Sequence, residues 1–487
     1  MRHLIFHSVF YPAFCALFTL PAAAQTQPPK INPAVTQIVA AISEQRIAAT
    51  LKKLESFGTR HTLSPQDDPA HGIGAAMRWL HDEFQSYSPR LEVSYQPFTI
   101  QRGGTAGGEV PLANVVAVLP GTTAKDRYVL VTAHYDSIHI VRKPASTDQE
   151  RLAGLIKQGM EESEARRYME LFPASETAPD ADAEATAAQA VAPGVTDDGS
   201  GTAAVLELAR VMSQHQFGKT LVFIAFSSEE GSHAGSKAYA AYAQKNGMQI
   251  EAVLNNDIIG SDVAGNGRTA NSVLRGFAAG PEDSGDRAAL RYIKETAERY
   301  VPQMHVEMVF HLDRFARGGD HMSFVDAGYP AVRLTTPAEN YANQHSATDT
   351  FAHASVPYTT RVARMNAAVA ASLALAPSPP LVNWTFASGR RKGQRIPMLT
   401  RGASGYDAVL RWERSSAPDV AGYAVVIRPT TSPAWEREIW VGNTTSYTLR
   451  DFSIDNVVLG VKAVDRTGDQ SLVAAYLESP YLSATER

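Results

Sequence analysis

Short apolar runs alternate with helical patterns between about residues 35 and 375 of the chain. The runs are rich in β-branched side chains and lack a regular apolar–polar alternation, as expected of strands covered on both faces. Strands are predicted at Ala113–Leu119, Tyr128–Ala133, Leu221–Phe226, Glu251–Asn256 and Ala331–Thr335, and helices at Ala75–Phe84, Val205–Met212, Ser236–Lys245 and Ala288–Tyr300. This order predicts an α/β sandwich with a largely parallel sheet.

A second pattern begins after the linker Pro377-Ser378-Pro379-Pro380. Short strands with turn signals between them predict a small all-β sandwich over residues 381–487. Trp412, Asp419–Tyr423 and the strand Val461–Asp465 make this part resemble a fibronectin type III domain.

Residues 140–192 interrupt the α/β pattern with a segment rich in Ala, Glu and Asp. A helix is predicted over Gln149–Leu171, followed by a looser stretch. An insertion of this length within a domain is either a lid over a cleft or a solvated surface helix with a linker.

The N-terminus has the pattern of an export signal. Arg2 and His3 precede an apolar run, Leu4–Leu20, and small residues follow at Ala22 and Ala24. Such a run is too short to span a bilayer, and the small residues fit a cleavage site. We expect residues 1–24 to be removed, leaving a secreted or periplasmic protein without a membrane span.

Composition narrows the choice of chemistry. The chain of 487 residues carries a formal net charge of −5, so it lacks the basic footprint of a nucleic-acid-binding protein. Its one cysteine, Cys15, lies within the signal. Disulfide frameworks and cysteine-based zinc sites are therefore excluded.

Histidines and carboxylates follow the predicted strands, at the edge where open α/β sheets bind ligands. Singly, each has a plainer explanation: Asp198 before Gly-Ser-Gly fits a helix N-cap, and paired glutamates suit a helix start. Together they form a set drawn from distant segments: His134 and Asp136, Asp197, Glu229 and Glu230, Asp257, and His345.

Clustered carboxylates need positive charge nearby, because burial and mutual repulsion otherwise raise their pKa values. Asp197, Glu230 and Asp257 supply three negative charges, and two divalent cations would offset them. His134 and His345 add neutral nitrogen donors. A mixed set of imidazole and carboxylate donors suits zinc better than calcium or magnesium.

The motifs in this order resemble the co-catalytic zinc aminopeptidase family of the glutamate carboxypeptidase superfamily, with bacterial secreted leucyl-type aminopeptidases and aminopeptidase Y as relatives. The resemblance runs over residues 45–375. The motifs are Gly58–Arg60, Ala133–Ser137, Pro193–Gly201, Ser228–Gly231, Asn256-Asp257, Gly319–His321 and His345–Asp349. The resemblance implies a three-layer α/β/α zinc exopeptidase domain with a mostly parallel mixed sheet at residues 35–376.

The resemblance also implies a role for each site residue. Two Zn²⁺ ions would be bound, one by His134 and Asp257 and the other by Glu230 and His345, with Asp197 between them. Glu229 would act as the general base and Asp136 would orient His134. A cis peptide bond is expected between Asp197 and Asp198. Asp320 and Asp349 have either a similar orienting role or a purely structural one.

The expected activity is that of an exported aminopeptidase acting on peptides with a free N-terminus. A carboxypeptidase or an amidohydrolase of the same superfamily would use the same residues. A glutaminyl cyclase fits less well, and a catalytically dead binding scaffold is the alternative from another class. Ile258 and Phe315 are candidates for the side-chain pocket, and either could equally belong to the core.

Overall fold

The computed structural model describes residues 31–101, 108–140, 142–144, 147–157, 160–171, 177–179, 189–282, 284–313, 318–382, 384–386, 392 and 395–477. The predicted signal, residues 1–24, lies outside them. None of the helices in the described part combines the length and apolar character needed to cross a bilayer.

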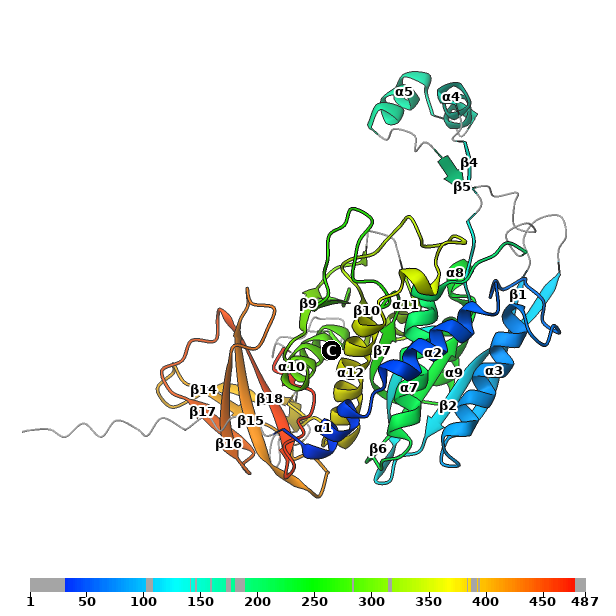
Figure 1. The fold of residues 1–487 in the computed structure, drawn as a ribbon. Coiled ribbons are helices and arrows are strands. Elements are labelled where there is room, and N and C mark those ends of the chain that lie inside the picture. Colours follow the sequence, from blue (N-terminus) through cyan, green and yellow to red (C-terminus); the bar gives the residue numbers. More distant parts are fainter. Residues whose placement is uncertain are drawn as a thin grey trace, which may run out of the picture.

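A mixed sheet of eight strands forms the centre of the molecule (Figure 1), in the order β1-β2-β6-β3-β7-β10-β8-β9. The strand β3 pairs in parallel with β6 and β7, and β10 continues the parallel set beyond β7. Antiparallel pairing joins β1 to β2, β2 to β6 and β8 to β10. The bounds are β1 Glu92–Gln101, β2 Glu109–Leu119, β3 Ala124–His134, β6 Lys219–Phe226, β7 Gln249–Asn256, β8 Val273–Phe277, β9 His305–Val309 and β10 Ala331–Thr335.

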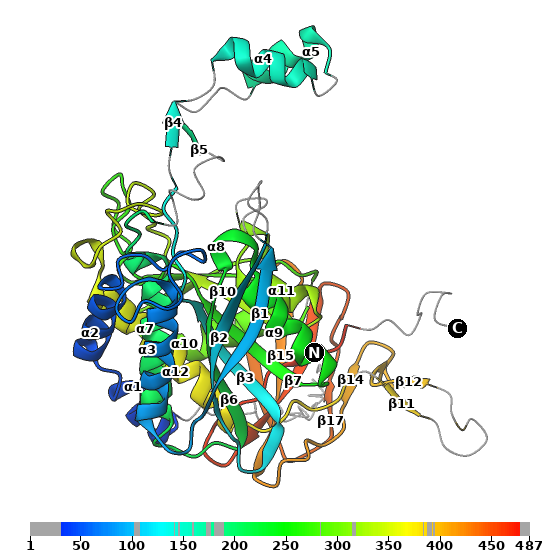
Figure 2. The same ribbon diagram turned by 90° about the vertical axis from the view of Figure 1, so that its right-hand side faces the viewer.

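Helices cover both faces of this sheet, as Figures 1 and 2 show. Successive strand residues point to opposite faces, so Val129 and Val131 join one apolar core while Leu130 joins the other. The larger core contains α1 Pro33–Ala40, α2 Glu44–Glu55, α3 Gly72–Tyr87, α7 Ser200–Met212, α10 Gly285–Tyr300 and α12 Val356–Leu375, and the smaller one α9 Ala234–Lys245 and α11 Asp320–Asp326. The predicted three-layer α/β/α fold is confirmed.

The insertion contains two helices where the sequence predicts one. The helix α4 covers Asp148–Lys157 and α5 covers Glu162–Leu171, beyond the two-stranded pair β4 Arg142–Pro144 and β5 Thr177–Pro179. A single helix over Gln149–Leu171 is therefore wrong. Gly159 stands between the two helices in the sequence, and glycine disfavours helical backbone. Figures 1 and 2 show α4 and α5 standing away from the sheet.

The C-terminal part is a small antiparallel sandwich, as predicted. One sheet has the order β13-β14-β17 and the other β16-β15-β18-β19. Leu410 of the first sheet and Trp412, which follows β14, share an apolar core with Val425 and Val461 of the second sheet. The likeness to fibronectin type III domains and the domain boundaries stay predictions. The bounds are β13 Leu399–Arg401, β14 Ala408–Arg411, β15 Val420–Pro429, β16 Arg437–Gly442, β17 Ser446–Leu449, β18 Val457–Asp465 and β19 Ala474–Ala475, and a separate hairpin pairs β11 Trp384–Phe386 with β12 Arg395–Pro397.

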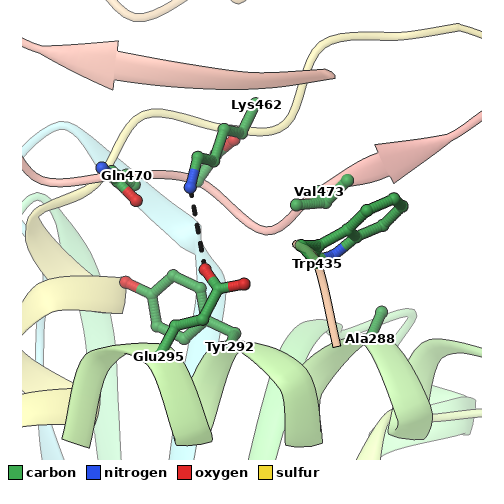
Figure 3. A pocket seen from close by; sticks show the side chains of 8 residues that line it. Ala288, Tyr292, Glu295, Trp435, Lys462, Gln470 and Val473 are labelled. Atoms are coloured by element: carbon green, nitrogen blue, oxygen red, sulfur yellow. Dashed lines mark ion pairs between the residues drawn. The ribbon is translucent and has the colours of Figure 1, made fainter. Parts of the chain in front are cut away.

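Partly buried polar contacts join the sandwich to α10 and to the segment before it. The Arg428 guanidinium donates to Glu282 at 2.6 Å, and Arg291 donates to the Pro433 carbonyl at 2.7 Å. Figure 3 shows Lys462 facing Glu295 across the same interface. The Lys462 Nζ lies 3.7 Å from Glu295 Oε2. The crevice there holds about 10 Å³, enough for about one water molecule. It is therefore a seam between two parts of the chain and too small for a substrate.

A chain ending at residue 378 tests this interface. Hydrogen bonds to charged groups contribute about 1.5–3 kcal/mol each, so we expect truncation to lower the free energy of unfolding by about 2–5 kcal/mol. Urea unfolding of the truncated and complete chains measures the difference. The full-length variant Arg428→Met should show a smaller loss in the same direction. Equal stability of the truncated and complete chains would mean that the sandwich is an independent accessory.

Candidate metal centre

The predicted donors come from segments that end at one edge of the sheet. His134 is the last residue of β3, Asp257 follows β7, and Glu229 and Glu230 open the short helix α8 Glu229–Ser232 after β6. Parallel neighbours β6, β3 and β7 have their carboxyl ends at the same edge, which explains the convergence. A pocket of about 220 Å³ is lined by Asp197, Glu229, Glu230, Gly231, His233, Asp257, Gly318 and His345.

Asp197 lies between the two histidines. Its Oδ1 is 3.3 Å from His134 Nε2 and its Oδ2 is 3.1 Å from His345 Nε2. His345 Nε2 also lies 3.0 Å from Glu230 Oε2. Zinc with donors at about 2.0–2.2 Å in a tetrahedron keeps those donors roughly 3.3 Å apart. The spacing of these atoms therefore fits shared coordination of metal.

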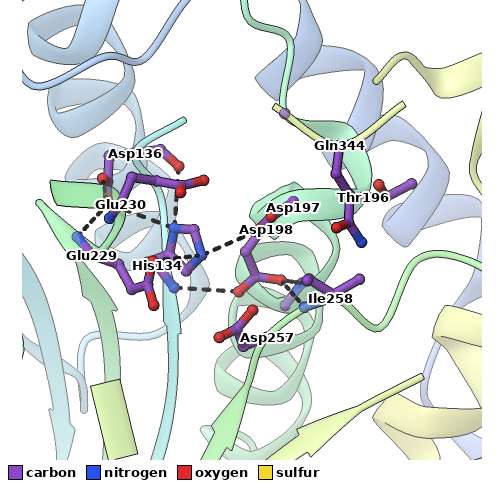
Figure 4. Close-up of polar contacts among 12 residues, drawn as sticks. His134, Asp136, Thr196, Asp197, Asp198, Glu229, Glu230, Asp257, Ile258 and Gln344 are labelled. Carbon is purple, nitrogen blue, oxygen red and sulfur yellow. Dashed lines mark hydrogen bonds and ion pairs between the residues drawn. The ribbon is translucent and has the colours of Figure 1, made fainter. Parts of the chain in front are cut away.

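The donor atoms form two overlapping groups. Within each group, all the atoms lie within 4.8 Å of one another. One contains His134, Asp197 and Glu230, and the other contains His134, Asp257 and Glu229. Figure 4 shows Glu229, His134, Asp197 and Asp257 grouped around one space. All five predicted ligands and the predicted base are thus brought together, while the division of labour among them stays a prediction.

Two carboxyl groups of the cluster have raised pKa values, as expected where cations are absent. Burial, followed by the negative charge of Asp197, raises the pKa of Glu230 to about 8. Burial also raises the pKa of Asp257 to about 6, although the Arg333 guanidinium opposes that shift. His134 Nε2 and Glu230 Oε1 are buried without a hydrogen-bond partner. Buried ligand atoms that make no hydrogen bond, among crowded carboxylates, fit a metal site.

Asp136 fixes the segment that carries the paired glutamates. Its carboxylate accepts the N–H groups of Glu229 at 3.1 Å and Glu230 at 3.2 Å. His134 Nδ1 lies 3.2 Å from the backbone carbonyl of Asp136 and 3.5 Å from its Oδ1. The residue lies within reach of His134, while its orienting role stays a prediction. It also fixes the α8 backbone, which the sequence did not indicate.

Two further buried carboxylates accept hydrogen bonds from the backbone of the segments that carry the predicted ligands. Asp349 accepts the N–H of Asp197 at 3.0 Å and the Thr196 hydroxyl at 2.6 Å. Asp198 accepts the N–H groups of His134 at 3.3 Å and Ile258 at 3.1 Å (Figure 4). The peptide bond between Asp197 and Asp198 is cis, which confirms the prediction.

The two candidates for the side-chain pocket were each equally open to a place in the core. Ile258 is fully buried and is absent from the residues that line the pocket, which favours the core alternative. Phe315 lies outside the described residues. Asp320 is buried at the start of α11, where burial and then the charge of Glu229 raise its pKa to about 8.

Sequence reasoning missed two residues of this site. Arg333 is buried in β10, and its Nη2 lies 3.1 Å from Asp257 Oδ1. The available signal was one arginine within the apolar run Ala331–Thr335. His233 lines the pocket, with Nε2 3.3 Å from Glu229 Oε1. Its signal was a histidine one turn after Glu229.

A three-layer α/β/α fold with imidazole and carboxylate donors at the carboxyl edge of its sheet defines a candidate metal-dependent enzyme. The chain belongs to peptidase family M28, which its residues 114–370 match.

Similar proteins were found among both sequences and structures. A protein of Pyricularia oryzae named as a probable zinc metalloprotease is 32% identical over 88% of this chain and 82% of its own length. Another, from Leptosphaeria maculans, is 30% identical over 88% of this chain and 94% of its own length. The solved aminopeptidase from Aneurinibacillus sp. strain AM-1 is 16% identical with a TM-score of 0.48, covering 74% of this chain and 98% of that one.

Proposed function

We propose that this M28 peptidase is a zinc-dependent aminopeptidase that releases the N-terminal residue from peptides. The observation that carries the proposal is the pocket that Glu229 lines together with four of the five predicted ligands, Asp197, Glu230, Asp257 and His345, while His134 lies within both groups of donor atoms. At about 220 Å³ the pocket is smaller than the roughly 300–1,000 Å³ of drug-sized ligand pockets.

The residues present fit zinc. His134 and Asp257 would hold one ion, Glu230 and His345 a second, and Asp197 both. Bound zinc would lower the pKa of a water molecule and would polarise the peptide carbonyl. The names of the fungal relatives support zinc as the metal.

In this proposal Glu229 is the residue that moves the proton. Its Oε2 lies 3.9 Å from His134 Nε2 and its Oε1 lies 3.3 Å from His233 Nε2, so the carboxylate borders the donor set. In this role the carboxylate accepts a proton from the attacking water. It then donates that proton to the leaving amine.

A panel of chromogenic amides tests this function. Aminoacyl amides should be cleaved, the same amides with a blocked N-terminus should not, and a chelator should abolish cleavage until zinc is returned. Preference for substrates with a free C-terminal carboxylate would favour the carboxypeptidase. Cleavage of simple amides alone would favour the amidohydrolase, and no cleavage by a zinc-loaded chain would favour the binding scaffold.

Export is part of the proposal, on the strength of the N-terminal pattern. Expression of the full chain in a bacterial host, followed by N-terminal sequencing of the product, should place the first residue at Gln25. A mature protein that begins at Met1 would remove the periplasmic or secreted assignment.

His345→Ala should reduce metal retention. The imidazole lies between Asp197 and Glu230, so its loss leaves one predicted ion with fewer donors. We expect the variant to retain about one of two zinc ions after dialysis, by analogy with the three or four protein ligands of stable zinc sites. Elemental analysis measures the ratio, with the exposed His71→Ala as the control. A full complement in His345→Ala would contradict the assignment.

A further inference from the structure

The two carboxylate oxygens of Glu229 face different histidines. Oε2 lies 3.9 Å from His134 Nε2, within the donor set. Oε1 lies 3.3 Å from His233 Nε2. His134 is buried, whereas the His233 side chain is 30% exposed and lines the pocket. The two imidazoles therefore flank Glu229 on its buried and solvent sides.

The position of His233 is built by its surroundings. Its own N–H donates to the Glu229 carbonyl at 3.3 Å, and its carbonyl accepts from Lys237 N at 3.0 Å. A Cβ on Gly318 would lie 3.2 Å from the ring Cε1, so the absence of a side chain there leaves room for the imidazole. The backbone contacts fix the backbone of His233, and the glycine leaves space for its ring beside Glu229.

The contact between His233 and Glu229 has a physical consequence. The terminal torsion of a glutamate side chain is broad, so packing alone does not select which oxygen faces the reaction. A hydrogen-bond donor at Oε1 would select the orientation in which Oε2 faces the reaction. Among the described residues, no other basic side chain pairs with Oε1, and His233 belongs to neither donor group.

We propose that His233 is a positioning residue for Glu229: it donates a hydrogen bond to Oε1 and thereby keeps Oε2 turned toward the attacking water. This inference rests on the proposed peptidase function and on Glu229 as its base. The neutral tautomer with its proton on Nε2 can supply this hydrogen-bond donor, and so can the protonated ring. The contribution of His233 is therefore orientation of the base, without contact with metal.

Two variants separate the hydrogen bond from the bulk of the ring. His233→Leu removes the donor and His233→Gln keeps one. Both place a residue with a β-carbon at the left-handed backbone conformation of His233, with φ of 54°, so the backbone cost is matched. A loss of about 10–100-fold in rate corresponds to about 1.4–2.7 kcal/mol in activation free energy.

We expect His233→Leu to lower kcat about 10–100-fold with KM changed by less than about 2-fold, and His233→Gln to restore kcat to within about 3-fold. Zinc content by elemental analysis should equal that of the unchanged chain in both variants. In the Glu229→Gln background, His233→Leu should have little further effect on the residual rate, because residues that act through one another are not additive.

Each contrary result has a distinct meaning. Unchanged kcat in His233→Leu, equal losses in the Leu and Gln variants, or loss of zinc in either would overturn the inference while the peptidase function stands. Full additivity with Glu229→Gln would also overturn it. If the unchanged chain holds zinc and cleaves no amide, the proposed function fails and this inference fails with it.

Discussion

Glu229→Gln is expected to keep its metal and to lose about 10²–10⁴-fold in kcat, the usual contribution of a positioned general base. The amide has nearly the shape of the carboxylate. The hydrogen bond from the backbone N–H of residue 229 to Asp136 does not involve the side chain and is unaffected. Glutamine cannot take up the proton of the attacking water at neutral pH. Steady-state kinetics on an aminoacyl amide, with zinc measured in the same preparation, tests the prediction.

Glu230→Gln is the informative companion. Glu230 Oε2 lies 3.0 Å from His345 Nε2, within the donor set, so this variant should lose metal as well as activity. The two variants would then differ in kind. Glu229→Gln would lose rate while it keeps its full zinc content, and Glu230→Gln would lose zinc. A Glu229→Gln chain with unchanged kcat, or with depleted zinc, would remove Glu229 from the role of base.

Arg333→Met should cause the largest loss of stability among the variants considered. The guanidinium is buried between Asp257 and Asp313, and both carboxylates are buried as well. Removing one member of a buried ion pair leaves an uncompensated charge and costs about 3–5 kcal/mol. Urea unfolding of the metal-free chain measures the loss without interference from bound zinc.

A matched control lies on the neighbouring strand. Arg275 of β8 pairs with Glu307 at the surface, 3.4 Å away, and such surface pairs contribute about 0–1 kcal/mol. Arg275→Met should therefore be nearly neutral. Adding Asp313→Asn to Arg333→Met should recover part of the stability, since one buried charge is removed. Equal losses at Arg275 and Arg333 would show that the buried pair has no special weight.

The pattern of apolar residues predicted the central strands well and the edges poorly. The five predicted strands all lie in the sheet, and Ala331–Thr335 agrees with β10 at both ends. The edge strand β1 was missed because none of its residues is buried, so it shows no apolar run. The helix α12 was missed because it is alanine-rich and buried over most of its length, which leaves no amphipathic stripe.

The candidate site was predicted from motifs whose signal is local. His134, Asp257 and the pair Glu229-Glu230 each follow a recognisable strand, so their meeting at one edge follows from parallel pairing. His233 and Arg333 carry no such signal. A single histidine near a helix start and a single arginine in a strand have many plainer explanations in any sequence.

The sequence alone determined the types of donor, their order, and the sheet edge where they gather, because strand period and parallel pairing are encoded locally. Only the tertiary structure decided which side chains touch them. Arg333 reaches Asp257 through the register in which β10 pairs with β7, and His233 reaches Glu229 because Gly318 leaves space opposite the ring. Register and facing surfaces depend on residues far apart in the chain, and no local pattern records them.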